Sequence, residues 1–403
     1  MRIWKVLILL SVLIMSACKD SPNEFGDDFI PANDRYSFYL CDTTSASDST
    51  YYNETYPEYK SLAEAIVIGK LDDMESSAIV RFPMSAPDSI KTMLQAGTIN
   101  IKSCWVKMNA LYYSGGKNST FDFTVHRITD SIDVTYLTSS QFNNVSYEAA
   151  DVSYSHFFDD TLATFGLNNS LITDWIMVQT SDSNNYPRNY GLMIKPTSST
   201  NKMMSFLAYE TSLGNAIKVY FEFEKPGVYT DTLSAYATAD TYSASCSAPT
   251  NTENYMTLVG AVTYKNKIYF DMPDLPSNAV MNKATLELFL DSTKSYLSTA
   301  VDTSYDAGGA IINVGIITEK NTLTIDTTNV LYVSLSSLTP NKYLGDITAF
   351  IQQWINTGNN YGLILSIYGE EYDASKLVFY GTKYSVASLR PRLKIIYSLR
   401  NKE

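Results

Sequence analysis

The stretch YGEEY, from Tyr368 to Tyr372, is the densest group of side chains in this sequence with the chemistry to bind a polar ligand. Tyrosine rings can lie against the flat C–H faces of sugars, because both surfaces are apolar. Glu370 and Glu371 can accept hydrogen bonds from sugar hydroxyls or supply oxygen ligands to Ca²⁺. The loop is therefore a candidate binding site for a glycan or an ion.

Tyr112 and Tyr113 form a second candidate, because they directly precede the loop SGGKNS. The alternative for both tyrosine pairs is structural, since tyrosine is a common residue of half-exposed strands. The sequence alone leaves both interpretations open.

Motifs for catalysis or metal binding are missing from the sequence. The two histidines, His126 and His156, have no partner at metal-ligand spacing. No nucleophile elbow, phosphate-binding loop or helical metal motif occurs. Carboxylates from distant strands can still meet in a β fold, so a polysaccharide-cleaving enzyme stays open as the least favoured function. We expect no enzyme activity and no cofactor, apart from the Ca²⁺ considered above.

Residues 1–17 predict a lipoprotein signal peptide. Arg2 and Lys5 supply positive charge, and the apolar run at residues 6–15 is too short to cross a bilayer as a helix. The ending MSAC resembles the bacterial lipobox, in which the cysteine is acylated and becomes the new N-terminus. The alternative is an ordinary cleavage site beside a cysteine. Cys18 is therefore the expected lipid anchor, in the outer membrane and facing the cell surface rather than the periplasm.

The charge of the chain argues against nucleic acid as a partner. The sequence has 30 basic and 42 acidic side chains, a formal net charge of −12. Loss of Arg2 and Lys5 with the signal peptide makes it more negative. Nucleic acid and anionic lipid surfaces repel a chain of this overall charge.

Three cysteines follow the expected anchor: Cys41, Cys104 and Cys246. An odd number cannot all pair within one chain, and the sequence does not say which two would form a disulfide. No CxxC pair occurs, which argues against a structural zinc site.

Strand signals dominate after a polar tether at residues 18–35. Tyrosine occurs 31 times, and alternating runs such as VKMNALYY (106–113) and FDFTVHRI (121–128) are separated by turn residues. IVIGKL (66–71) and AIVRF (78–82) flank DDMES and predict a hairpin. This pattern is typical of an all-β sandwich or barrel.

One short helix is predicted over residues 346–358. Apolar side chains recur there at helical spacing: Ile347, Phe350, Ile351, Trp354 and Ile355. Asp346 is a suitable N-cap and Gly358 a suitable C-cap. A shorter counterpart is expected near Trp175, and we expect Trp175 and Trp354 to pack in the core.

The same series of short motifs occurs twice along the sequence, in the same order. NNYGLILSI (359–367) matches RNYGLMIKP (188–196), LVGAV (258–262) matches IVIGK (66–70), and LKIIY (393–397) matches IKVYF (217–221). Such a repeat predicts two copies of one fold. We expect two tandem jelly-roll-like β-sandwich domains, each with a short helix, at residues 36–224 and 230–398. Pro226-Gly227 is the expected joint between them.

The second copy resembles the DNRLRE domain, also called disaggregatase-related, which is grouped with carbohydrate-binding modules. The resemblance rests on ITAFIQQW, NNYGLIL and the closing RPRLKIIY; the first copy lacks the Arg-Pro-Arg ending. The tether, with Lys19-Asp20 and GDDFIP, resembles the start of Bacteroidetes surface lipoproteins. The resemblance implies a jelly-roll-like sandwich, a surface setting and glycan binding.

We therefore expect a lipid-anchored surface or outer-membrane protein with a non-catalytic glycan-binding or adhesive role. The alternative is a structural spacer, or a subunit of an envelope assembly, without a small ligand. The expected partners are the membrane, through Cys18, a polysaccharide or other glycan, and envelope proteins.

Overall fold

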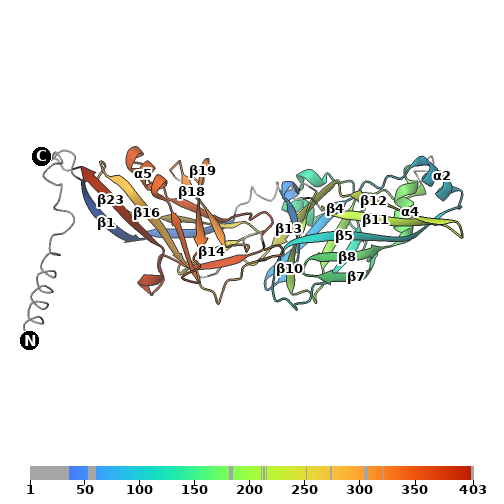
Figure 1. Ribbon diagram of the computed structural model, residues 1–403, viewed down its shortest axis with the longest axis horizontal. Helices are drawn as coiled ribbons and strands as arrows, with labels where there is room; N and C mark the ends of the chain where they lie inside the picture. Colours follow the sequence, from blue (N-terminus) through green and yellow to red (C-terminus); the bar gives the residue numbers. More distant parts are fainter. Residues whose placement is uncertain are drawn as a thin grey trace, which may run out of the picture.

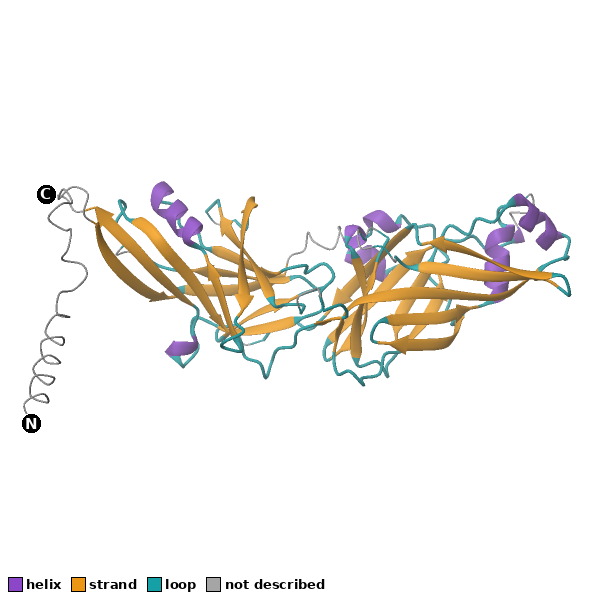
Figure 2. Ribbon diagram, in the orientation of Figure 1, coloured by secondary structure: helices purple, strands orange, loops and turns teal. Residues whose placement is uncertain are grey.

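The computed structural model describes residues 36–400, apart from 53–59, 181–184, 210, 212–213, 215, 251, 273–274, 304–306 and 321. The signal peptide, the tether and Cys18 lie outside the described residues. In the described part, no helix is long and apolar enough to span a membrane. This part is nearly all β, as predicted, and Figure 2 shows two bodies rich in strands with a few short helices.

The first domain is a curled sheet that folds into two layers, with three α-helices among its described residues. Its strands are β3 (Ala65–Leu71), β4 (Met74–Arg81), β5 (Asn100–Ser114), β6 (Phe123–Arg127), β7 (Ser153–Asp159), β8 (Leu162–Leu167), β9 (Leu192–Pro196), β10 (Lys202–Leu207), β11 (Lys218–Lys225), β12 (Tyr229–Tyr236) and β13 (Ala239–Ser245). Its helices are α2 (Asp88–Gln95), α3 (Ser139–Asn143) and α4 (Asn169–Met177). The long strand β5 belongs to both layers, because it pairs first with β11 and β8 and then with β10.

The second domain is one large curled sheet with a single described α-helix. Its strands are β1 (Tyr36–Thr44), β2 (Ser47–Tyr52), β14 (Tyr255–Val259), β15 (Tyr264–Tyr269), β16 (Val280–Phe289), β18 (Ile311–Ile317), β19 (Ile325–Leu335), β20 (Lys342–Asp346), β21 (Leu363–Ile367), β22 (Lys376–Tyr380) and β23 (Arg392–Arg400). The helix is α5 (Thr348–Thr357), and a 3₁₀ turn at Ala387–Leu389 precedes β23; a further 3₁₀ turn at Val134–Tyr136 lies in the first domain.

The two domains share nine strand pairs in the same order, as the predicted duplication requires, although β18–β19 and β5–β10 pair in one domain each. The pairs β3–β4, β3–β10, β4–β9, β4–β13, β5–β8, β5–β11, β6–β9, β7–β8 and β11–β12 correspond to β14–β15, β14–β22, β15–β21, β15–β2, β16–β20, β16–β23, β18–β21, β19–β20 and β23–β1. Each domain also has its own large cluster of buried apolar side chains.

Two pairs of strands lie on the opposite domain from the one predicted. β1 pairs along its whole length with β23, and β2 pairs with β15, although residues 36–52 fall within the predicted first domain. Conversely, β12 pairs with β11 and β13 pairs with β4, although both belong to the predicted second domain. Each repeat therefore gives its leading strand pair to the other repeat, and the predicted boundaries 36–224 and 230–398 need this correction.

The turn at Pro226-Gly227 is not the joint between the domains. Gly227 adopts a left-handed conformation, with φ of 70°, and β12 turns back on β11 as a hairpin. Because β12 and β13 then complete the first domain, the chain passes to the second domain only after Ser245. The predicted turn at Pro226-Gly227 is therefore present. The prediction that the strand after it belongs to the second domain is wrong, because that strand pairs with β11.

The helix α5 follows the prediction closely. Phe350, Ile351 and Trp354 are buried against the second core, and Gly358 ends the helix in the left-handed conformation. Asp346 lies one residue before the N-cap and accepts a hydrogen bond from the amide of Thr348 at 2.9 Å. In the counterpart α4, Trp175 is buried as predicted.

The domains are joined end to end by a buried seam (Figure 1). The short strand β17 (Thr299–Ala300) of the second domain pairs with Tyr112 and Tyr113 of β5. Val259, Ala261, Val262 and Ala374 of the second domain pack into the core cluster of the first. The two bodies therefore share apolar packing as well as two chain connections.

Candidate functional site

The predicted glycan loop lies in the seam between the domains. Tyr112 is only 9% exposed, and its ring stacks on that of Tyr372 with the centroids 6.2 Å apart and the planes 5° apart. Glu370 is 4% exposed and forms an ion pair of 2.6 Å with Lys265. The Tyr112–Tyr372 stack joins the two domains, the Lys265–Glu370 pair lies within the second domain, and Tyr112 and Glu370 are buried.

The backbone of the same loop is also engaged across the seam. The Tyr242 hydroxyl donates to the Glu371 carbonyl, and the Ser205 hydroxyl donates to the Tyr372 carbonyl. Tyr113 is half-buried, with the Lys202 amine 4.5 Å from its ring centroid. Of the six predicted residues, Tyr112 and Tyr372 are in direct contact. Tyr113, Glu370 and the Glu371 carbonyl each contact another protein group.

Tyr368 is the exposed member of the predicted group. Its side chain is 51% exposed, and its ring meets that of Tyr332 edge to face at 6.0 Å. An isolated exposed pair of this kind makes a weaker sugar site than a row of rings would.

Burial in the seam shifts the pKa values of two side chains, Glu370 and Lys60. Burial raises the pKa of Glu370, and the neighbouring Lys265 offsets this only in part. Burial lowers the pKa of Lys60 to about 7, against the attraction of Glu370. The Lys60 amine donates to the carbonyl of Ala261 and lies 4.6 Å from the Tyr242 ring centroid. These groups make the seam sensitive to pH.

The printed contacts of both histidines lie within the first domain, and His156 places its Nε2 2.8 Å from the Ser153 hydroxyl and its Nδ1 3.6 Å from an Asp122 carboxylate oxygen. The His126 ring lies 3.0 Å from the Glu148 carbonyl and 2.8 Å from the Thr124 hydroxyl. The His156 ring stacks on Phe123 at 4.6 Å. Among the described residues, no group of three or more histidine, cysteine, aspartate or glutamate side chains is arranged to hold a metal ion. No disulfide joins Cys41, Cys104 or Cys246 to another cysteine among the described residues.

An outward-facing row of aromatic rings on the first domain is a stronger candidate. In β5 the side chains of Cys104, Val106 and Met108 point into the core, which leaves Trp105 on the outer face. Trp105 lies directly opposite Tyr220 of β11, and their rings stack with the centroids 5.3 Å apart and the planes 4° apart. Both residues are partly exposed to solvent.

Further rings extend this row to both sides. Gly166 of β8 lies opposite Trp105, and the Tyr154 ring covers it so closely that a Cβ there would lie 2.5 Å from the ring. Tyr154, Phe157 and Tyr236 are 44%, 55% and 52% exposed. We call the set the aromatic stripe, and it consists of Trp105, Tyr154, Phe157, Tyr220 and Tyr236. It crosses β7, β8, β5, β11 and β12, which lie next to one another in the first domain (Figure 1).

Two lysines stand in the aromatic stripe. Lys107 of β5 and Lys218 of β11 are direct cross-strand partners. Like charges at such positions repel each other. The Lys218 amine lies 5.2 Å from the Tyr220 centroid and 4.7 Å from the Tyr236 centroid, a cation–π geometry that keeps the charge beside the rings. An anionic group bound between the lysines would relieve the repulsion.

The sequence contained a signal for this surface that was not used. The alternation in VKMNALYY was read as a strand, and extending it one residue backwards places Trp105 on the face opposite Val106. The contributions of Tyr154, Tyr220 and Tyr236 were not accessible in this way, because they depend on which strands neighbour β5.

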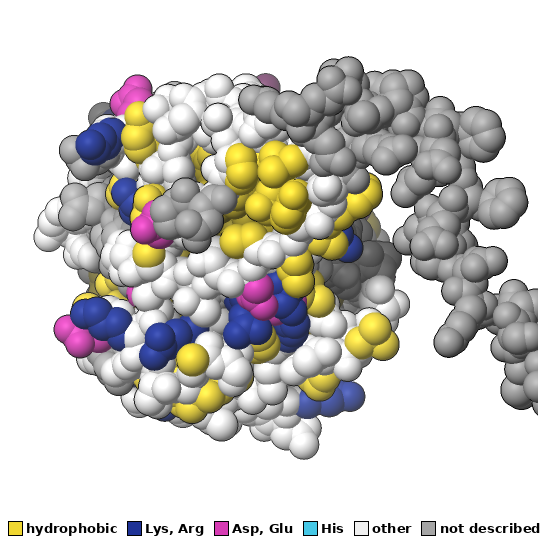
Figure 3. Space-filling view, turned by 90° about the vertical axis from the view of Figure 1, so that its left-hand side faces the viewer, with side chains coloured by type: hydrophobic (Ala, Val, Ile, Leu, Met, Phe, Trp, Pro, Cys, Tyr) yellow, Lys and Arg dark blue, Asp and Glu magenta, His cyan; other side chains and the backbone are white. Residues whose placement is uncertain are grey.

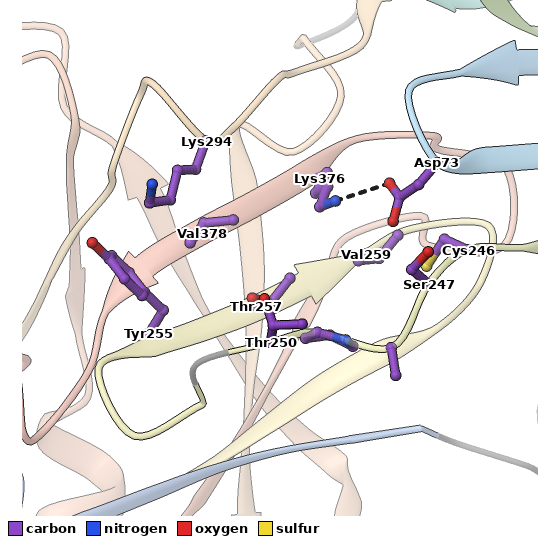
Figure 4. Close-up of a pocket in the computed structure, with 12 residues that line it drawn as sticks. Asp73, Cys246, Ser247, Thr250, Tyr255, Thr257, Val259, Lys294, Lys376 and Val378 are labelled. Carbon is purple, nitrogen blue, oxygen red and sulfur yellow. Dashed lines mark hydrogen bonds and ion pairs between the residues drawn. The ribbon is translucent and has the colours of Figure 1, made fainter.

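A groove beside the seam is a further candidate site (Figure 4). It encloses about 420 Å³ and is lined by Tyr255, Thr257 and Val259 of β14 and by Val378 of β22. At one end Lys376 is paired with Asp73 of the first domain at 3.0 Å, which ties the groove to the seam. The groove has one lining aromatic ring, so we rank it below the aromatic stripe for binding a sugar.

Comparison with known proteins adds no relative: no protein family matches this chain, and no curated protein does so. The resemblance to the DNRLRE domain therefore stays a prediction.

Proposed function

We propose that this chain is a non-catalytic surface lipoprotein that binds an acidic polysaccharide through the aromatic stripe of its first domain. The observation that carries the proposal is the stack of Trp105 on Tyr220 on the solvent-facing side of the sheet. Exposed rings in a row favour a ligand with repeated flat apolar faces, and the pyranose rings of a polysaccharide provide these. The expected DNRLRE resemblance and lipid anchor agree with this role.

The lysines narrow the class of polysaccharide. Lys107 and Lys218 are opposed on adjacent strands beside the rings, so a ligand with carboxylate or sulfate groups gains charge pairing that a neutral glucan does not. The shallow sheet face also suits an extended chain better than a small enclosed sugar.

The test is glycan-array binding by the soluble chain from residue 20, followed by affinity measurements on the polysaccharides that are retained. We expect Trp105→Ala and Tyr220→Ala each to weaken binding by about tenfold, which corresponds to about 1.4 kcal/mol. Circular dichroism establishes that the variants are folded.

Tyr209→Ala is the matched control, because Tyr209 is a 49% exposed tyrosine of the first domain that lies outside the aromatic stripe. It should bind as the wild type does. Unchanged binding by both stripe variants, on every polysaccharide that the wild type retains, rejects the proposal.

The second candidate is a structural spacer in an envelope assembly. It is supported by the seam, in which loop 368–372 ties the second domain to Tyr242 and Ser205 of the first. No retained glycan on the array, together with envelope proteins that co-purify with the chain, would favour this alternative.

A further inference from the structure

The outer face of the second domain carries an apolar patch at the end of the molecule where the described chain begins and ends. We call it the tip patch, and it consists of Phe38, Leu40, Val280 and Ile396, which are 68%, 71%, 51% and 40% exposed. On the sheet, Leu40 lies opposite Ile396, and Ser398 lies between Phe38 and Val280. Figure 3 looks at this end of the molecule and shows hydrophobic side chains gathered there.

The duplicated fold supplies an internal comparison for the tip patch. Ser234 lies opposite Tyr220 in the first domain, in the register position that Leu40 and Ile396 occupy in the second. Likewise, Thr232 stands opposite Glu222 where Phe38 stands opposite Ser398. The same sheet positions are thus polar on β12 and apolar on β1, so the fold itself does not require exposed apolar residues at these places.

Basic side chains border the tip patch. In the next rows of the same sheet face, Lys394 lies 3.0 Å from Glu287, and Arg392 pairs with Asp42 at 3.3 Å. Lys283, which is exposed, lies directly beside Ile396. The border therefore has an excess of positive charge, although the chain as a whole carries −12. An apolar surface with a basic border is typical of proteins that lie in a lipid interface.

The chain outside the structure leads to this same end. β1 starts at Tyr36, and residues 18–35 join it to the expected lipid anchor at Cys18. Fully extended, this tether reaches at most about 60 Å, and as a random coil roughly 23 Å. A lipid on Cys18 would keep the tip patch close to a bilayer.

We propose that the tip patch rests in the interface of the lipid bilayer that holds the anchor. The second domain then stands on the membrane by its end, and the first domain, although earlier in the sequence, points away from it. This inference rests on the anchor in the proposed function and is independent of polysaccharide binding.

The test uses the full lipidated protein, reconstituted in phosphatidylcholine vesicles with brominated acyl chains, which quench tryptophan at short range. Mass spectrometry of the N-terminal peptide first checks the acylation of Cys18. We expect the additional emission of a Phe38→Trp variant to fall at least about twofold relative to unbrominated vesicles, because the ring enters the lipid. Adding Leu40→Ser and Ile396→Ser to Phe38→Trp should remove most of that quenching.

Val228→Trp is the matched control. Val228 is 67% exposed in the turn between β11 and β12, at the opposite end of the molecule (Figure 1). Its emission should not respond to bromine. The proposal is overturned if bromine quenches the Phe38→Trp and Val228→Trp variants equally. It is also overturned if Cys18 carries no acyl chains. Emission at position 38 that depends on protein concentration instead of bromine, with a dimer by light scattering, would assign the tip patch to a second copy. Polysaccharide binding by the same preparation is measured separately, so the two proposals can fail independently.

Discussion

Trp105 stacks on Tyr220 across two neighbouring strands, with 5.3 Å between the ring centroids and 4° between the planes. Such a pair contributes about 0.5–1.5 kcal/mol beyond its buried area. The register-equivalent pair in the second domain is Lys283 and Ile396. The two copies therefore kept one topology while one sheet face became aromatic in the first and aliphatic in the second.

The position of the Tyr154 ring depends on Gly166, which has no side chain in its way. A Cβ at Gly166 would lie 2.5 Å from the ring, so Gly166→Ala should displace it and weaken polysaccharide binding roughly fivefold, about 1 kcal/mol. In a Tyr154→Ala background the same change should have little further effect, because the displaced ring is already gone. Isothermal titration of the single and double variants checks this, and additive losses would contradict it.

Lys107 and Lys218 should set the preference for acidic polysaccharides. Changing both to Gln should weaken binding of an acidic polysaccharide roughly two- to fivefold for each lost charge, since exposed pairs contribute about 0.5–1 kcal/mol. Binding of a neutral polysaccharide should not change. Added salt should weaken the wild type and bring it towards the double variant. Equal losses on neutral and acidic ligands would assign the lysines a structural role.

The exchange of strand pairs can be tested with engineered disulfides. Phe38 lies opposite Ser398, and antiparallel partners have Cα atoms roughly 4.5–5.5 Å apart, within the range that a disulfide bridges. Phe38→Cys with Ser398→Cys should therefore form a cross-link within one chain, seen by peptide mapping. Phe38→Cys with Glu222→Cys should not, because that pairing belongs to unexchanged repeats. The reverse result would place β1 on the first domain.

Lys60 predicts a specific pH dependence of stability. Its pKa is about 7 in the folded chain and about 10.5 when exposed, so the unfolded state binds more protons between these values. The free energy of unfolding contributed by this group therefore rises with pH across that window, by up to about 1.4 kcal/mol per pH unit. Relative to wild type, Lys60→Met should lose this rise in urea unfolding measured at about pH 7.5 and about pH 9.5.

Glu370 supplies the control for that experiment. Its raised pKa acts with the opposite sign, because a folded carboxyl that holds its proton loses stability as the pH rises from its unfolded pKa to its folded pKa. Glu370→Gln should keep the alkaline rise due to Lys60. If the free energy of unfolding changes with pH in the same way in wild type and Lys60→Met, the lowered pKa of Lys60 is contradicted.

The sequence allowed the prediction of local features and of the duplication. The apolar spacing of α5, the left-handed Gly358 and the burial of Trp175 follow from short-range patterns, and each is present. The exchange of β1 and β12 was not predicted, since an edge strand's sequence does not say which edge it pairs with. The same limit hid the aromatic stripe, because Trp105 meets Tyr220 only once β5 and β11 are neighbours.

The predicted glycan loop shows that residue composition can fit two different environments. Tyr372 and Glu370 have the composition of a sugar-binding loop, and that composition also suits a polar seam between two domains. Only the packing of Tyr112 on Tyr372 distinguishes the two uses. Residue type alone therefore drew attention to this loop but did not show that it lies at the seam between the domains.

The most direct measurement of the central proposal is the tryptophan emission of the soluble chain from residue 20 during titration with an acidic polysaccharide. Trp175 and Trp354 are 1% and 3% exposed, whereas Trp105 in the aromatic stripe is partly exposed. We predict a saturable blue shift that is lost in Trp105→Phe, because sugar rings displace water from the indole. Saturable binding of the polysaccharide with no change in emission would contradict a ligand on this face.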